Sequence, residues 1–374
     1  MHILNCVNDL ANGGIEAFCL NINKNIDTNK FKIDYFLTLG KNEYHKDSIK
    51  ELGGNIFNIN NIKLRKYFMN KLKIFFSTIN ILKNNGPYNA VHIHNCKGMS
   101  SILLASWICR VPIRITHSHN AFYPKSKSFK LQTKIKIADI IRKIYINIFS
   151  TNKLGCSQEA CKSMYGNKCF KDKRTEIIFN GIDLEKFNIK NYDKEELIKK
   201  YKVTKENINF INIGRYSEEK NQLFLIDIFY ELSKKRNNVN LTIIGHGEMK
   251  AKIKEYITKL NLQDKIRLMP HDSCIPEVLS TMDYFILPSI HEGLGIVLIE
   301  AQAMGLHCFA SNYVPEEAQV GLCNYINLED GVNKWCENID KYIENKNKRY
   351  IDKDKLFKYD IKAIVKRMEE IYIK

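Results

Sequence analysis

The stretch YFILPSIHEGLGIVLIEAQAM, residues 284–304, holds the pattern that decides the fold. It begins with four consecutive apolar residues, which is typical of a buried strand in a parallel sheet. A glycine-containing loop follows, and then the apolar segment Ile296–Met304, which has the length of a short helix. The stretch therefore predicts a strand, a glycine loop and a helix, the repeating unit of a doubly wound α/β domain.

Short β-rich runs alternate with longer amphipathic runs along most of the chain, so we expect two consecutive parallel sheets. In the first half the expected strands are His2–Val7, Phe31–Thr38, Asn55–Ile59, Ala90–His94, Arg114–Ser118, Lys153–Cys156 and Glu176–Phe179. In the second half they are Ile208–Ile213, Leu241–Ile244, Ile266–Met269, Tyr284–Leu287 and Cys308–Ala310.

The turn-type sequence Asn-Gly-Ile-Asp at residues 180–183 separates the two series. We therefore predict an α/β protein of two Rossmann-like domains, 1–180 and 181–354, with a last segment at 355–374 that includes a helix and packs back on the first domain. In such an architecture the carboxyl ends of both sheets face an interdomain cleft, and any site lies on the loops that follow strands.

The composition is that of a globular protein, because 44% of the 374 residues are hydrophobic and 26% are charged. The eleven cysteines form no C-x-x-C pair, which favours a reduced, cytoplasmic chain. Neither a signal peptide nor an apolar run of about 18–20 residues is evident. The net charge of +17 predicts an anionic partner, and no recognisable motif points to nucleic acid.

Glycines open the loops that follow two of the predicted strands. Gly13 and Gly14 offer bare backbone N–H groups that can bind a phosphate or a sugar hydroxyl, with a plain tight turn as the alternative. Gly214 and Arg215 follow a strand of the second series, and Lys220 lies at the next helix start. Arg forks onto phosphate and Lys adds a mobile charge, so this loop predicts an anion clamp; a charged surface turn is the alternative.

Two pairs of histidines close neighbouring strands of the first series. His92 and His94 end one strand, and His117 and His119 end the next. We favour a role in positioning a substrate hydroxyl or stabilising charge near a reacting carbon. A structural role and a metal site are the alternatives, but no carboxylate or cysteine cluster of the usual kind accompanies the pairs.

Two acids flank the glycine loop of the 284–304 stretch. Glu292 precedes the predicted helix, and Glu300 lies about two turns further along. Between them, Gly293 and Gly295 expose N–H groups at the positive end of the helix. Carboxylates that hold hydroxyls at the two ends of a ligand, with N–H groups on a phosphate between them, suit a nucleotide-sugar. An amphipathic helix with a glycine-rich cap and incidental acids is the alternative.

With these features the chain resembles the retaining glycosyltransferases of the GT-B fold, family 4 or group 1, which build capsules, exopolysaccharides and lipid-linked glycans. The resemblance spans residue 1 to about residue 308 and is specific for family rather than for substrate. It rests on an ordered set of motifs: Gly-Gly-Ile-Glu at 13–16, His-Ser-His-Asn at 117–120, Asn-Gly-Ile-Asp at 180–183, Gly-Arg with Lys five residues after the Arg, and Glu-x7-Glu.

The resemblance implies which residues contact the donor. Glu292 would bind the hydroxyls of the donor sugar, and Glu300 those of the ribose. Arg215 and Lys220 would bind the diphosphate next to Gly214. The distal phosphate would be bound by the backbone N–H groups of Gly293, Leu294 and Gly295.

The first domain would contribute two further contacts. Gly14, with Gly13 beside it, would close over the diphosphate. A histidine of the 117–119 stretch would sit beside the donor sugar; we prefer His119, and His117 stays open.

The implied reaction moves a sugar, with retention, from a nucleotide-sugar such as a UDP-sugar to a saccharide or polyprenyl-diphosphate-linked acceptor. Arg215, Lys220 and the helix N–H groups would stabilise the leaving diphosphate, so neither a metal nor another cofactor is expected. The leaving phosphate would accept the acceptor's proton. The alternatives are another nucleotide-sugar enzyme of similar architecture, either an epimerase or an inverting transferase, and a non-catalytic nucleotide-sugar-binding partner subunit.

Basic residues gather among apolar ones in two segments of the first half, and we interpret them as a face that rests on the anionic inner leaflet of the cell membrane. Two ordinary core-facing helices with solvated lysines are the alternative. The first segment carries Lys63, Arg65, Lys66, Lys71, Lys73 and Lys83, and the second carries Lys125, Lys127, Lys130, Lys134, Lys136, Arg142 and Lys143.

Overall fold

The computed structural model describes residues 1–10, 14–40, 45–59, 67–119, 129–271, 273–345 and 350–374. These residues form two compact units, Met1–Gly181 with Ile361–Lys374, and Ile182–Asp360. Each unit has its own parallel sheet with helices on both faces, so the predicted pair of doubly wound α/β domains is confirmed. The cleft between them stays a prediction. None of the helices described is both long enough and apolar enough to cross a bilayer.

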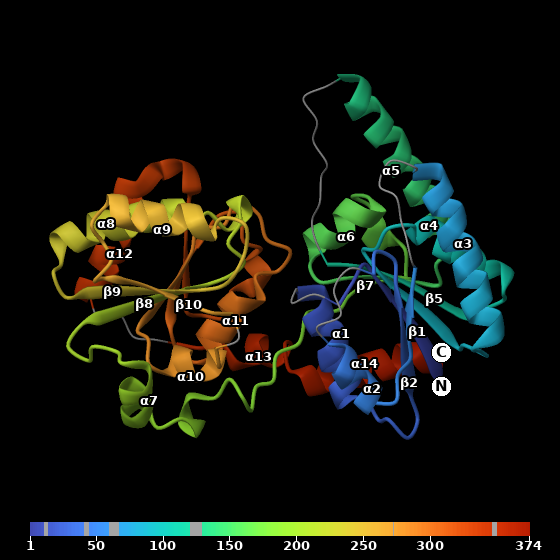
Figure 1. Cartoon of the computed structure of the whole chain (residues 1–374), viewed down its shortest axis with the longest axis horizontal. Helices are drawn as coiled ribbons and strands as arrows, with labels where there is room; N and C mark the ends of the chain where they lie inside the picture. Colours follow the sequence, from blue (N-terminus) through green and yellow to red (C-terminus); the bar gives the residue numbers. More distant parts are fainter. Residues whose placement is uncertain (11–13, 41–44, 60–66, 120–128, 272, 346–349) are drawn as a thin grey trace. The chain divides into compact units, whose positions relative to one another are not determined.

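The first unit is built on a seven-stranded parallel sheet of order β3-β2-β1-β4-β5-β6-β7 (Figure 1). The strand order reverses between β1 and β4, so the loops after these strands diverge and leave room for a ligand. The strands are β1 His2–Val7, β2 Lys32–Leu37, β3 Ile56–Asn58, β4 Ala90–His94, β5 Ile113–Ser118, β6 Asn152–Gly155 and β7 Thr175–Ile177.

Helices cover both faces of this sheet because successive strand residues point to opposite sides. Ile3 and Val7 of β1 join the core beneath α1, α2 and α14, whereas Leu4 and Cys6 join the core beneath α3, α4 and α6. The helices are α1 Gly14–Asn25, α2 Lys46–Glu51, α3 Tyr67–Asn84, α4 Met99–Ile108, α5 Phe129–Phe149, α6 Gln158–Tyr165 and α14 Ile361–Ile373.

The C-terminal helix α14 completes the core of the first unit. Met368 and Tyr372 are buried against α1, in the same cluster as Phe18. Arg367 forms a two-pronged ion pair with Glu176 at β7, with N–O distances of 2.7 and 2.8 Å. Burying one such apolar side chain contributes about 1.5–3 kcal/mol, so the helix is firmly attached and can position neighbouring groups of the site.

The second unit has a six-stranded parallel sheet of order β10-β9-β8-β11-β12-β13, which reverses between β8 and β11. In Figure 1, α8, α9 and α12 cover one face, and α10 and α11 cover the other. The strands are β8 Ile208–Ile213, β9 Val239–Ile244, β10 Ile266–Met269, β11 Tyr284–Leu287, β12 His307–Ser311 and β13 Cys323–Ile326. The helices are α7 Lys194–Tyr201, α8 Gln222–Lys235, α9 Lys250–Lys259, α10 Ile275–Ser280, α11 Ile296–Ala303, α12 Gly331–Asn345 and α13 Lys353–Phe357.

Candidate active site

The loops that follow β8 and β11 are tied together at the point where the strand order of the second unit reverses. The N–H of Ile290 donates to the carbonyl of Glu219 at 2.8 Å. The side-chain amide of Asn221 donates to the carbonyl of Pro288 at 3.2 Å, from a left-handed backbone position that opens α8. The Gly-Arg loop and the Glu-x7-Glu element therefore form one structure.

Lys220 and Glu292, which lie in these two loops, form an ion pair with an Nζ–Oε1 distance of 2.5 Å. The side chains of Lys220 and Glu292 are 22% and 7% exposed. Ser289 also donates its hydroxyl to Glu292 Oε1, at 2.8 Å. A donor diphosphate and a donor sugar can divide this pair, because Lys220 attracts phosphate and Glu292 accepts from hydroxyls.

Close backbone packing shapes the loop that carries Gly214. A Cβ at Gly245 would lie 2.0 Å from the carbonyl oxygen of Gly214, so only glycine fits there. The Lys220 side chain lies over Gly214, with its Cδ 3.6 Å from the position of a Cβ. The Arg215 side chain is exposed and pairs with Glu248 at 3.4 Å, a contact that a stronger anion can replace.

Helix α11 starts directly after this loop. Gly295 caps the helix with a left-handed φ of 78°. Glu300 lies in the same helix, and burial raises the pKa of its carboxyl to about 8. At neutral pH this group is therefore mostly protonated, and a ribose that needs the carboxylate form must displace its proton.

Histidines and a glycine lie at the carboxyl ends of the strands in the sheet of the first unit. Gly14 is the first residue of α1, and a Cβ there would meet nothing within 4 Å. Gly13 lies outside the described residues. His117 and His119 are both buried, with 0% and 4% exposure, and burial lowers the pKa of the His119 ring to about 3. The ring of His119 is therefore neutral at physiological pH.

The two histidine pairs form one cluster, which their spacing in the sequence does not reveal. In the sheet His94 pairs with His117, and one ring nitrogen each of His92, His94 and His117 lie within 4.8 Å of one another. Neutral imidazoles so close together could hold a transition metal. Hydrogen bonds already join them: His92 Nε2 to His117 Nδ1 at 3.2 Å, and His94 Nδ1 to His119 Nε2 at 2.9 Å.

The predicted site residues thus fall into one set in each unit. In the second unit the structure brings together Gly214, Lys220, Glu292, Gly293, Leu294 and Gly295, with Glu300 further along α11 and Arg215 at the outer side of its loop. In the first unit His117 and His119 are in one cluster, and Gly14 opens α1.

Sequence reasoning missed the supporting residues of the second-unit site. Ser289 and Asn221 are near the motifs, but only the fold shows that they bond to Glu292 and Pro288. Tyr216 is buried under the Gly-Arg loop, where its hydroxyl donates to the carbonyl of Ile243. The one signal in the sequence for Tyr216 as a supporting residue is its position directly after Gly-Arg.

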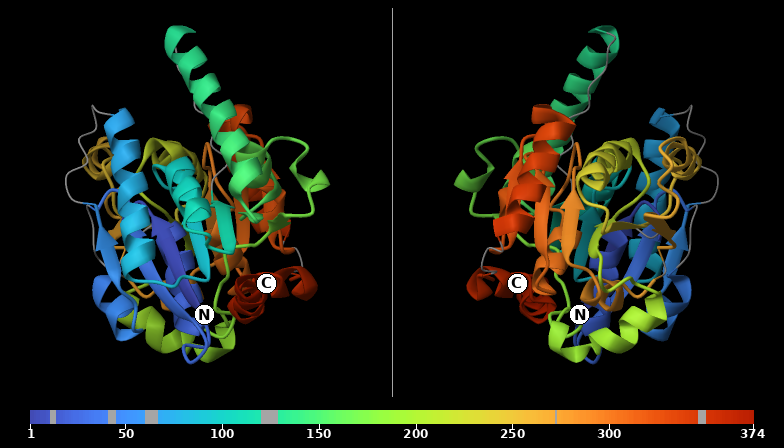
Figure 2. Two further views of the ribbon diagram at one scale, coloured as in Figure 1. Left: turned by 90° about the vertical axis from the view of Figure 1, so that its right-hand side faces the viewer. Right: turned by 90° about the vertical axis from the view of Figure 1, so that its left-hand side faces the viewer.

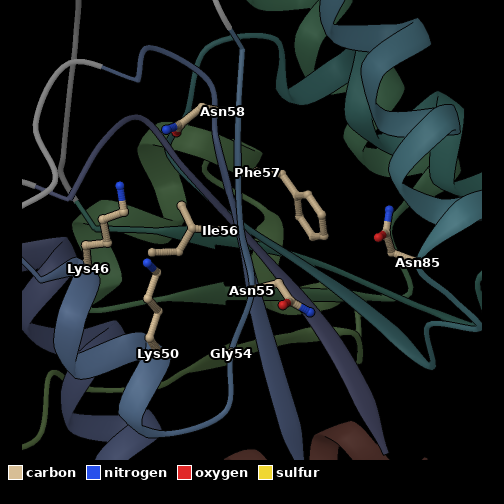
Figure 3. A pocket seen from close by; sticks show the side chains of 8 residues that line it. All are labelled: Lys46, Lys50, Gly54, Asn55, Ile56, Phe57, Asn58 and Asn85. Carbon is tan, nitrogen blue, oxygen red and sulfur yellow. The ribbon is translucent and has the colours of Figure 1, made fainter.

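A hollow of about 440 Å³ lies at the edge strand β3 of the first unit and is lined by none of the predicted site residues. Figure 3 shows Ile56 and Phe57 pointing to opposite sides of this strand. Lys46 and Lys50 reach the hollow from α2. Because the lining side chains do not converge on one point, we assign no ligand to it.

Residues 193–353 match the family model for the glycosyl transferases group 1. The matched residues lie within the second unit, and the predicted resemblance to this family is confirmed. The glycosyltransferase is 28% identical over 379 residues to the capsular polysaccharide biosynthesis glycosyltransferase CapH of Staphylococcus aureus, covering 100% of this chain and 98% of that one. It is 31% identical over 253 residues to the UDP-Gal:alpha-D-GlcNAc-diphosphoundecaprenol alpha-1,3-galactosyltransferase of Escherichia coli, covering 64% of this chain and 62% of that one.

A solved structure shows the same fold. The crystal structure of HepE from Anabaena in complex with UDP and glucose aligns with this glycosyltransferase at a TM-score of 0.77 and 19% sequence identity, covering 98% of each chain. The predicted GT-B fold and the predicted family, group 1 glycosyltransferases of the capsule and exopolysaccharide type, are therefore confirmed.

Proposed function

We propose that this glycosyltransferase moves a sugar, with retention of configuration, from a UDP-sugar to a saccharide or lipid-linked saccharide acceptor. The observation that carries the proposal is the Lys220–Glu292 pair, held by two interlocked loops directly ahead of helix α11. An ammonium, a carboxylate and helix N–H groups at one strand-order reversal match the parts of a nucleotide-sugar.

Each part of the donor has a partner in the second unit. The diphosphate would bind Lys220 and Arg215, and the transferred sugar would bind Glu292 through its hydroxyls. Glu300 would bind the ribose, and because its pKa is raised, binding by its carboxylate form would release a proton. Two relatives support the choice of nucleotide: one is named for UDP-Gal, and the other was solved with UDP and glucose.

The same groups would stabilise the charge that develops on the leaving group. As the bond between sugar C1 and phosphate oxygen breaks, negative charge collects on the diphosphate, facing Lys220 and the N–H groups at the start of α11. The acceptor oxygen bonds to C1 from the same face, and its proton passes to the leaving phosphate oxygen. The protein supplies the positive charge itself, so we propose that transfer needs no divalent metal.

The first unit would contribute His119 beside the donor sugar, with His117 as the neighbouring candidate, and Gly14 over the diphosphate. Among the described residues, nothing lies within 4 Å of a Cβ placed at Gly14, which is consistent with such an approach. A neutral His119 can donate or accept a hydrogen bond without adding charge.

A lipid-linked acceptor would bring the enzyme to a membrane, and the first unit has a suitable surface. Helices α3, α4 and α5 lie next to one another in the first unit (Figure 2). Their exposed apolar side chains form what we call the apolar face. Its members are Met69, Leu72, Phe76, Trp107, Ile137, Ile140, Ile141, Ile144 and Ile148. On α5 the isoleucines recur three or four residues apart, which places them on one side of the helix.

Basic residues accompany this apolar face, so we propose that it rests on anionic lipid at the inner leaflet. Lys71 and Lys73 lie on α3 between its exposed apolar residues, and Arg142 and Lys143 lie on α5 beside Asp139. A basic residue near an anionic surface contributes about 1 kcal/mol, and the apolar side chains add burial. Five other basic residues that the sequence assigns to this surface lie outside the described residues: Lys63, Arg65, Lys66, Lys125 and Lys127.

Retention is tested by the anomeric configuration of the product. Purified full-length protein is incubated with a UDP-sugar identified by ligand-induced thermal shift, and the new linkage is determined by NMR with and without a chelator. An α-linkage from the α-configured donor, formed equally in both reactions, agrees with the proposal. A β-linkage would make the enzyme an inverting transferase, and an altered sugar without transfer would make it an epimerase. Binding without turnover would leave a partner subunit.

A further inference from the structure

Four buried histidines of the first unit, His92, His94, His117 and His119, are paired in a way that the proposed reaction does not yet use. His92 and His94 are two residues apart on β4, and His117 and His119 are two residues apart across the end of β5, so each pair lies on one face of the sheet. All four are at most 4% exposed. Phe18 of α1 packs on the rings of His117 and His119, with centroid distances of 5.0 and 5.2 Å.

Burial favours the neutral form of each ring in the cluster. It lowers the pKa of His92, His94 and His117 well below 6.5 and that of His119 to about 3, so each ring is neutral. A neutral imidazole has one N–H donor and one lone pair. In the 2.9 Å contact between His94 Nδ1 and His119 Nε2, one nitrogen must therefore carry the proton and the other must lack it.

We propose that His94 is a positioning residue that fixes the ring orientation and the tautomer of His119. If His94 Nδ1 donates, His119 is protonated on Nδ1; if His94 Nδ1 accepts, His119 is protonated on Nε2. In either case the tautomer of His119 depends on His94, which ends the neighbouring strand β4. The inference rests on the proposed function only in that His119 is taken to lie beside the donor sugar.

A second chain of contacts holds His92 and His117 in place. The hydroxyl of Tyr372, on the attached helix α14, lies 2.8 Å from His92 Nδ1, and His92 Nε2 lies 3.2 Å from His117 Nδ1. The rings of His92 and His94 are 3.8 Å apart between centroids. The C-terminal helix thus contacts the cluster at His92 rather than at His119. A change at Tyr372 is therefore a matched control for a change at His94.

The test compares three variants of the full chain. His94→Phe keeps a ring but loses the hydrogen bond, whereas His94→Asn keeps an amide near the position of Nδ1 and can still bond to His119. Tyr372→Phe removes one hydroxyl from the same buried network. Thermal unfolding of each variant shows whether it is folded, and NMR of the ring nitrogens reports the tautomer of His119 without any substrate.

We expect His119 to occupy one tautomer in the wild type and a mixture of both in His94→Phe. His94→Asn should restore a single tautomer, and Tyr372→Phe should retain it. The turnover number should fall at least tenfold in His94→Phe, with little change in the KM for the donor, because the reacting groups are misplaced rather than lost. His94→Asn should recover most of the turnover. If wild-type chain transfers no sugar, the proposed function fails while the tautomer measurement still decides the role of His94.

Three results would overturn the assignment. One is a His119 tautomer in His94→Phe identical to that of the wild type. Another is an equal loss of turnover in folded His94→Phe and Tyr372→Phe, which would indicate general loosening of the cluster. The third is a stoichiometric transition metal in the purified protein that is lost in His92→Phe, since a metal ion would then fix the rings in place of the hydrogen bonds.

Discussion

Replacing Lys220 by Met separates the two tasks that the structure gives to this lysine. The change leaves Glu292, which is 8% exposed, without its cation. Losing one partner of a buried ion pair costs about 3–5 kcal/mol, whereas exposed pairs contribute about 0–1 kcal/mol. Because the Lys220 side chain is 22% exposed and Ser289 still donates to Glu292, we expect a loss of about 2 kcal/mol in the free energy of unfolding.

The double variant Lys220→Met/Glu292→Gln tests the reasoning. It leaves no unpaired charge, so most of the lost stability should return in chemical denaturation. Turnover should remain low in both variants, because both lack the charged hydrogen bond from Lys220 to the donor diphosphate, which contributes about 1.5–3 kcal/mol or at least tenfold in rate. The double variant also lacks the carboxylate proposed to bind the donor sugar.

Lys205→Met is the matched control. Lys205 forms a pair of the same length with Glu195, but both side chains are largely exposed, so neither stability nor turnover should change measurably. Recovery of turnover together with stability in the double variant would contradict a role of either residue in binding the donor. Unchanged turnover in Lys220→Met would refute the anion clamp altogether.

Three further outcomes follow from the structure. The affinity for UDP, measured by calorimetry, should rise with pH and level off above about pH 8 as Glu300 loses its proton, and Glu300→Gln should flatten this dependence. By contrast, Glu292→Gln should spare UDP affinity and reduce transfer. A pH-independent affinity of the wild type would exclude Glu300 from the ribose site. Gly14→Ala should leave the melting temperature unchanged yet lower turnover, and full activity would place the donor away from α1. The protein should sediment with anionic liposomes but not with neutral ones, and the sedimented fraction should fall in high salt and in the double variant Ile140→Ser/Ile144→Ser. Phe357→Ser, on the second unit, is the control. Equal binding to neutral vesicles would remove the electrostatic part of the proposal.

Most of the fold could be predicted because its strands are continuous apolar runs. The exceptions have physical reasons. β13 mixes Asn324 and Tyr325 into a half-exposed edge strand, so it lacks the apolar run that marks the others. Helix α7 has no apolar face that would predict it, because Leu197 is its only buried residue, although Asp193 caps it and acids fill its first turn.

The site could be predicted as motifs but not as contacts. Lys220 and Glu292 are 72 residues apart, and they meet because β8 and β11 are neighbours in the sheet. The two histidine pairs meet because the register sets His94 beside His117. Spacing along the chain contains neither the strand order nor the register, since the order depends on the direction of each crossover and the register on how the apolar faces of neighbouring strands align.

The central claim is tested most directly by nucleotide release during transfer. Purified wild-type protein and Lys220→Met are each incubated with UDP-glucose, UDP-galactose, UDP-N-acetylglucosamine or GDP-mannose, with and without a synthetic lipid-diphosphate-linked saccharide. We predict that one UDP-sugar gives acceptor-dependent release of UDP by the wild type and at least tenfold less by Lys220→Met. Release that is the same in both proteins, or release from GDP-mannose alone, would contradict the assignment of the donor site.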